Sequence, residues 1–205
     1  KETKESAEKA ADGFTVMKGA LADLAADSMK KIISGAKDMV SSYDDAATKM
    51  QGQTGATIEE MEKYKDVMEE VYAGGYGEDL EEVAEAMSEV KKQTKEVDPS
   101  SLKDMTRYAM DLQQTFDFDV AESIRTVNQL TKQFGITNEE AFDIIVSGAQ
   151  NGLNQNDNLL DTLNEYSPKF KAIGMSANDM YNMLISGAEE GIFDIDKLGD
   201  AINEF

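Results

Sequence analysis

The sequence predicts an all-α protein in which one long amphipathic helix is followed by about four helical hairpins. Three observations point to this fold class: a composition rich in strong helix formers, apolar residues at three- and four-residue spacings, and a self-match with a period of about 39 residues. Only two prolines occur, and alternating runs of β-branched residues are nearly absent. We expect the hairpins to stack as an α-solenoid-like array or to close into a bundle.

Residues 1–52 are expected to form the long helix, with coiled-coil-like spacing. A single helix cannot cover its own apolar stripe, so it must pack on the hairpins, on chain outside this sequence, or on copies of itself. Self-association through residues 14–50 is therefore one prediction. The stripe consists of apolar residues that recur mostly at steps of three and four: Phe14, Met17, Leu21, Leu24, Ile32, Met39, Tyr43 and Met50.

The second half of the chain contains an internal repeat. Residues 135–166 align without a gap on residues 174–205, with ten identities in 32 positions, where ordinary residue usage would give about two. The run Ser147-Gly148-Ala149, for example, returns as Ser186 and the two residues after it. Apolar positions agree as well, so the two segments are expected to share one fold.

Each hairpin is predicted to open with a capping box. In this motif a Ser or Thr side chain accepts a hydrogen bond from the backbone N–H three residues on, and an acidic side chain there reaches back. The later two pairs belong to the 39-residue repeat, and the earlier two suggest divergent copies. The four pairs are Thr57 with Glu60, Ser101 with Asp104, Thr137 with Glu140, and Ser176 with Asp179.

The ends of the helices follow from glycine and acidic residues. Gly152 and Gly191 are suited to the position after a helix, because glycine enters the left-handed region without strain. Gly74, Gly75 and Gly77 are expected to break the first hairpin. The second helices should begin near Glu78, Asp119, Asp157 and Asp196. The predicted hairpins thus cover residues 53–205, at about 57–97, 101–133, 135–171 and 174–205.

Composition excludes several classes of function. The formal net charge is −21, which opposes direct binding to the phosphates of nucleic acids and to anionic lipid. The chain has no cysteine and no histidine, which removes thiol nucleophiles, histidine bases and the common zinc ligands. We therefore predict no catalytic, cofactor-binding or metal-binding residue, no cofactor, and a protein that is not an enzyme. Membrane contact by this segment is also not expected.

Two features leave a functional and a structural interpretation open. Residues 154–158, with Glu165, distantly resemble a calcium loop, but Asn154 and Leu159 stand where such a loop needs Asp and Gly, so a helix N-cap is favoured. Methionines form a loose stripe, which could fill the core or make an adaptable binding surface. Core filling is favoured for this set: Met17, Met29, Met39, Met50, Met61, Met68 and Met87.

Several segments resemble the tail tape measure proteins of phages and prophages. They are residues 13–26 (GFTVMKGALADLAA), 32–40 (IISGAKDMV), 119–130 (DVAESIRTVNQL), 134–142 (FGITNEEAF), 159–170 (LLDTLNEYSPKF) and 185–191 (ISGAEEG). The resemblance implies a structural virion protein that fills the tail lumen, sets tail length and leaves ahead of the DNA. It also implies tail tube, tail tip and assembly chaperone proteins as partners, and the host cytoplasm as the place of assembly. No individual functional residue carries over.

The alternative is a helical-repeat scaffold of unrelated origin that binds another protein along its stacked surface. Both ends of the sequence read as helix in progress, at residues 1–11 and 202–205, so we expect a fragment of a longer chain. A scaffold should continue as regular hairpins, whereas a tape measure should continue as very long helix.

Overall fold

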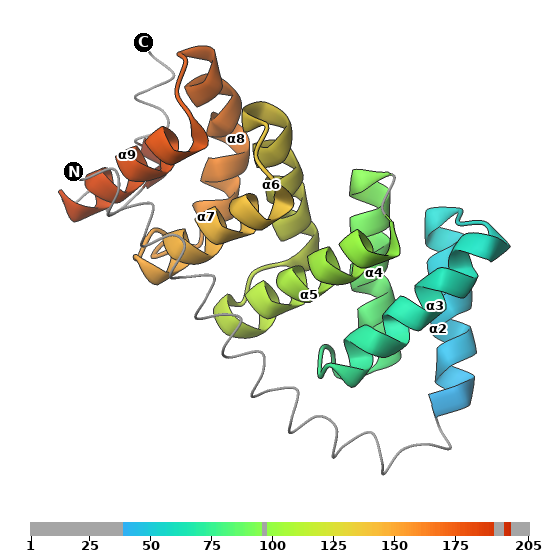
Figure 1. The fold of residues 1–205 in the computed structure, drawn as a ribbon. Coiled ribbons are helices and arrows are strands. Elements are labelled where there is room, and N and C mark those ends of the chain that lie inside the picture. The colour runs from blue at the N-terminus through green and yellow to red at the C-terminus, as the bar shows by residue number, and fades with distance from the viewer. Residues whose placement is uncertain (1–38, 96–97, 191–194, 198–205) are drawn as a thin grey trace. The chain divides into compact units, whose positions relative to one another are not determined.

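A computed structural model describes residues 39–95, 98–190 and 195–197, and within these ranges the chain is helical and contains no strand (Figure 1). The predicted all-α class is confirmed. The bounds of the described helices are α2 Met39–Thr54, α3 Ile58–Ala73, α4 Leu80–Thr94, α5 Pro99–Phe116, α6 Val120–Phe134, α7 Asn138–Gln150, α8 Leu159–Ala172 and α9 Ala177–Glu189.

The chain divides into two compact units, and the boundary falls within α6, between Ile124 and Arg125. The described part of the first unit contains α2 to α5 and the start of α6. The described part of the second contains the rest of α6 and α7 to α9. The division of the sequence at residue 52 into a long helix and a repeat region stays a prediction.

In the first unit, α2 packs chiefly on α4, while α3 packs on both α4 and α5. Methionine fills much of this core, because Met50, Met68 and Met87 are fully buried and Met61 is 5% exposed. The core-filling interpretation is confirmed for these four residues. Met17, Met29 and the side chain of Met39 lie outside the described part of the structure.

In the second unit, α8 packs on both α7 and α9, and α7 also contacts α9. Thr126 of α6 also donates a hydrogen bond to the carbonyl oxygen of Leu160 in α8, at 3.3 Å. Large buried side chains from each helix meet in the core: Phe142, Ile145, Leu163, Tyr166, Phe170 and Leu184.

Three of the four predicted capping boxes are confirmed, at Thr57, Thr137 and Ser176. The fourth, Ser101 with Asp104, is wrong. Helix α5 begins at Pro99, and the carboxylate of Asp98 accepts hydrogen bonds from the N–H groups of Ser100 and Ser101 at 3.0 and 3.2 Å. Proline fits the first helical position, and the negative charge of the Asp98 carboxylate is favourable at the positive end of the helix dipole.

The described helices α3, α7 and α8 end in the same way, with two hydrogen bonds closing around a left-handed glycine. After α7, the N–H of Gly152 (φ +79°) donates to Ala149 at 3.2 Å and that of Leu153 donates to Gly148 at 2.9 Å. This pattern is the Schellman motif. Gly75 and Gly174 take the equivalent places after α3 and α8, whereas Gly191 lies outside the described residues.

The second helices begin within two residues of the predicted positions. Helix α4 begins at Leu80, α6 at Val120 and α8 at Leu159, and residues 195–197 around the predicted fourth start are helical. The predicted long helix is described only from Met39, where it appears as α2 and ends at Thr54. Its first 38 residues lie outside the described part of the chain.

Candidate functional site

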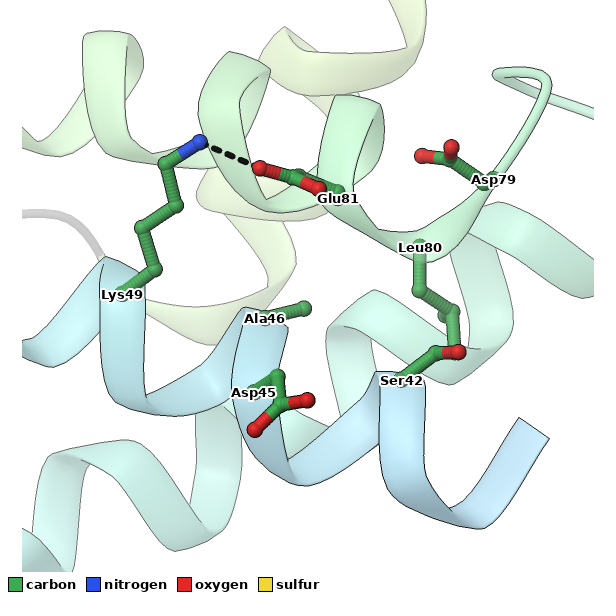
Figure 2. A pocket seen from close by; sticks show the side chains of 7 residues that line it. All are labelled: Ser42, Asp45, Ala46, Lys49, Asp79, Leu80 and Glu81. Carbon is green, nitrogen blue, oxygen red and sulfur yellow. Dashed lines mark hydrogen bonds and ion pairs between the residues drawn. The ribbon is translucent and has the colours of Figure 1, made fainter. Parts of the chain in front are cut away.

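A shallow groove of about 250 Å³ runs between α2 and the start of α4 (Figure 2). In Figure 2, Lys49 extends from α2 across the groove to Glu81. Most of the polar lining is acidic, so the groove offers carboxylates and one ammonium group. Its lining residues are Ser42, Asp45, Ala46, Lys49, Asp79, Leu80 and Glu81.

Lys49 joins α2 to α4 through two carboxylates. Its Nζ atom lies 2.5 Å from Oε1 of Glu81 and 2.5 Å from Oε1 of Glu85. Hydrogen bonds to Glu81 and then to Glu85 raise the pKa of the Lys49 ammonium, so it stays charged at any physiological pH. All three side chains are well exposed, and exposed ion pairs add little stability. This contact therefore orients the helices rather than forming a reactive centre.

Lys91 makes a less exposed link between α4 and α3. Its Nζ atom lies 3.1 Å from Oε1 of Glu60 and 5.4 Å from the centroid of the Tyr64 ring, and its side chain is only 12% exposed. The backbone N–H of Thr57, followed by Lys91, lowers the pKa of Glu60 to about 2. One carboxylate thus completes a capping box and pairs with a neighbouring helix.

The first unit also contains a buried carboxylate that the sequence analysis missed. Asp111 of α5 is 2% exposed, and no described group forms a hydrogen bond with its Oδ2 atom. Burial raises the pKa of Asp111 to about 7, although Arg107 opposes the shift. Arg107 lies over the ring of Tyr76, which comes from the loop between α3 and α4. Helical spacing gave no signal for this burial, because residues three or four positions away, such as Arg107 and Gln114, are polar.

The second unit contains a buried polar contact between α7 and α9. The hydroxyl oxygens of Ser147 and Tyr181 lie 2.5 Å apart. The side-chain amide of Asn151 donates to the carbonyl oxygen of Ser147 at 2.8 Å and lies 3.4 Å from the Tyr181 oxygen. Burial raises the pKa of Tyr181, so the phenol remains protonated. This contact fixes the relative position of two helices that occupy equivalent places in the repeat.

None of these arrangements brings a nucleophile, a base and an oxyanion donor together in the described residues. The calcium-like stretch precedes α8, where Oδ1 of Asn154 accepts a hydrogen bond from the N–H of Leu159 at 3.1 Å, whereas the N-cap residue Asn158 makes no side-chain cap hydrogen bond. Among all the residues that the structure describes, no three acidic side chains lie close enough together to hold a metal ion. The prediction that the protein has no catalytic, cofactor or metal residue stays a prediction.

No described helix has both the length and the apolar character needed to cross a membrane.

Helices that repeat along the chain, joined by ion pairs and buried hydroxyls, define a helical-repeat protein. The family described as "Phage-related minor tail protein" matches residues 72–205, and the chain belongs to this family. The resemblance to phage tail tape measure proteins is thereby confirmed, and a structural role in the phage tail follows from it.

A curated relative is similar over a shorter stretch. It is the "Probable tape measure protein" of Streptomyces phage phiC31, which is 44% identical over 66 residues. That stretch is 32% of this chain and 9% of the relative, so the matching segment spans only a small part of the relative's length. No solved structure matches the chain.

Proposed function

We propose that this chain is a segment of a tail tape measure protein, which sets tail length, templates assembly of the tail tube and leaves ahead of the DNA at infection. The observation that carries the proposal is the 44% identity with the probable tape measure protein of phage phiC31. Membership of the minor tail protein family and a described fold made only of helices support it.

The proposed partners are tail tube, tail tip and assembly chaperone proteins, and the proposed locations are the tail lumen and, during assembly, the host cytoplasm. The net charge of −21 suits the lumen, because incoming DNA would be repelled from such a surface. Direct binding of DNA at physiological salt, measured by gel shift, would remove this part of the proposal.

A tape measure gains about 1.5 Å of length per residue only where it is continuous helix, and folded hairpins are several-fold shorter. We therefore propose that the repeat hairpins open inside the tail tube. The small residues Gly148, Ala149, Gly187 and Ala188 on α7 and α9 bury little apolar surface, and little buried apolar surface gives a low free energy of local opening. Uniformly slow, cooperative hydrogen exchange across all the hairpins would count against opening.

The decisive experiment changes the length of the protein inside the phage. Deleting residues 135–173, one repeat period, from the parent gene should shorten the tail by about 58 Å if this segment lies in the tube as extended helix. A tandem duplication of the same residues should lengthen it by the same amount. Tail length is measured on electron micrographs of the virions.

A matched control keeps the length and changes the content. Replacing residues 135–173 with 39 residues of an Ala-, Glu- and Lys-rich helical sequence should leave the tail length unchanged. If deletion and replacement both abolish assembly, while duplication leaves the tail length unchanged, the segment acts instead as a protein-binding scaffold. That result would favour the alternative function suggested by the stacked hairpins.

A further inference from the structure

Helix α7 holds α9 through a specific polar seat. We define the α7 seat as Ser147 and Asn151, which lie one helical turn apart and receive the hydroxyl group of Tyr181. Ser147 is 1% exposed and Tyr181 is 6% exposed, so the contact is shielded from water. Tyr181 stands five residues after Ser176, the residue that caps α9.

The 39-residue repeat reproduces this seat on α9. Ser147 corresponds to Ser186 and Asn151 to Glu190, and we call this pair the α9 seat. Both residues of the α9 seat are exposed, and no described side chain hydrogen-bonds to either. The neighbouring apolar position shows the same contrast, since Val146 is fully buried whereas Ile185 is only half-buried.

We propose that the α9 seat docks a further helical hairpin of the same repeat type. Its first helix would carry a tyrosine five residues after its capping Ser or Thr, as α9 does. The argument is one of continuity, because the interface between α7 and α9 would be reproduced between α9 and the incoming helix. This inference concerns only the packing of repeat units, and it stands independently of the role proposed for the tail.

The one difference between the two seats specifies the chemistry of the partner. Asn151 can donate a hydrogen bond to the Tyr181 oxygen, but a Glu190 carboxylate can only accept. The incoming group must therefore be a donor. A phenol satisfies both residues, because it donates to Glu190 and accepts from the hydroxyl group of Ser186. A phenylalanine, as found at Phe142 in the preceding unit, would leave the carboxylate unpaired where it is shielded from water.

The test is a single-cysteine labelling experiment, which the absence of native cysteine makes clean. The 205-residue chain is compared with an extended chain in which a second copy of residues 167–205 follows residue 205, so that the repeat continues in register. Both carry Ser186→Cys. We expect the thiol to react with a maleimide at least tenfold more slowly in the extended chain. The rate should approach that of Ser147→Cys, the buried equivalent.

Two control chains separate docking from simple lengthening. In the first, 39 residues of Gly and Ser replace the added copy, and labelling should be as fast as in the 205-residue chain. In the second, the tyrosine of the added copy is changed to phenylalanine, which should restore a large part of the fast labelling. Far-UV circular dichroism should show a gain of helix on extension, since the added hairpin is expected to fold on the seat.

Four outcomes would overturn the proposal. One is equal labelling of the extended and Gly/Ser chains, and a second is no gain of helix on extension. Another is slow, concentration-independent labelling of the 205-residue chain, which would show that residues 191–205 cover the seat themselves. The last is labelling of that chain that slows as its concentration rises, because a second copy would then be the occupant.

Discussion

The guanidinium carbon of Arg107 lies 5.2 Å from the centroid of the Tyr76 ring, one helical turn from the buried carboxylate of Asp111. Tyr76 belongs to the loop between α3 and α4, whereas Arg107 lies on α5, so this cation–π contact fastens the first hairpin to the next helix. Asp111 is left beside it as a buried acid with an unpaired oxygen atom.

Asp111 should make the stability of the protein depend on pH. The pKa of Asp111 is raised to about 7 in the folded protein, so the folded state binds a proton that the unfolded state has already lost. Stability should therefore fall as the pH rises from about 4 to about 7, and level off above that. Asp111→Asn should remove this part of the fall and stabilise the protein by about 1–3 kcal/mol at pH 7.5.

Urea unfolding at pH 4.5, 6.0 and 7.5 measures this effect as the difference between the wild type and the variant. Asp45→Asn, which alters an exposed acid, is the matched control and should show a nearly constant difference. Because Arg107 interacts electrostatically with Tyr76, Asp104 and Asp111, the variant should be checked for an unchanged circular dichroism spectrum. If the stability difference between the wild type and Asp111→Asn did not change with pH, the Asp111 carboxyl group would be exposed to water in the folded protein.

Two glycines should respond oppositely to alanine. Gly77 has a φ of +78°, and an added Cβ would lie 3.1 Å from the Cε atom of Met110 and 3.2 Å from the carbonyl oxygen of Asp79. Gly77→Ala should destabilise the protein by about 1–3 kcal/mol. Gly52 lies within α2 with open space around it, so Gly52→Ala should stabilise the protein by about 0.5–1 kcal/mol. Thermal melts of both variants test the two predictions. Equal shifts of the melting temperature would contradict the described backbone conformation at Gly77.

The start of α5 predicts a contrast between two aspartates. Asp98→Ala removes the acceptor of two backbone N–H groups and should lower the stability measurably. Asp104→Ala removes a residue of the incorrectly predicted capping box and should change stability by less than about 0.5 kcal/mol. Chemical denaturation at pH 7 distinguishes them. A larger loss of stability for Asp104→Ala than for Asp98→Ala would support the predicted capping box at Ser101 instead.

The ion pairs of Lys91 and Lys49 should differ in strength. Lys91→Met leaves Glu60 without its partner and removes the ammonium group from the Tyr64 ring, and should cost about 1–2 kcal/mol. Lys49→Met affects exposed groups and should have a smaller effect, which disappears at about 1 M salt because the salt screens the interaction. Unfolding at low and high salt measures both. Similar losses of stability for the two variants at low salt would show that the lower exposure of Lys91 does not strengthen its ion pair.

The features predicted most accurately from the sequence are the helix ends, which depend on local hydrogen bonds and backbone conformation. Helix starts follow from capping side chains such as Thr57 and Thr137, and helix ends follow from glycines such as Gly152, so their positions were predictable to within a few residues. Ser101 was misread because its hydroxyl group resembles a cap, although Asp98 and Pro99 stand just before it. The competing signal lay in the sequence, but it did not match the capping pattern found in the other units.

Tertiary placement could not be obtained in the same way. Helical spacing indicated which face of α2 is apolar. It did not indicate that α2 packs chiefly on α4 or that Met50 is fully buried there. The burial of Asp111 and the pairing of Ser147 with Tyr181 also depend on which helix lies opposite. Neither is visible from residue type, because an aspartate or a serine on a helix usually faces water.

The Schellman glycines have a consequence for how such a chain is made. Each described hairpin carries its own signals for starting and stopping its helices, and its partners lie within about one repeat period along the chain. A hairpin of this kind can therefore fold while the ribosome is still translating the next one, since it needs few residues that have not yet been synthesised. A chain of such hairpins would expose only a short stretch of apolar surface at any moment of its synthesis.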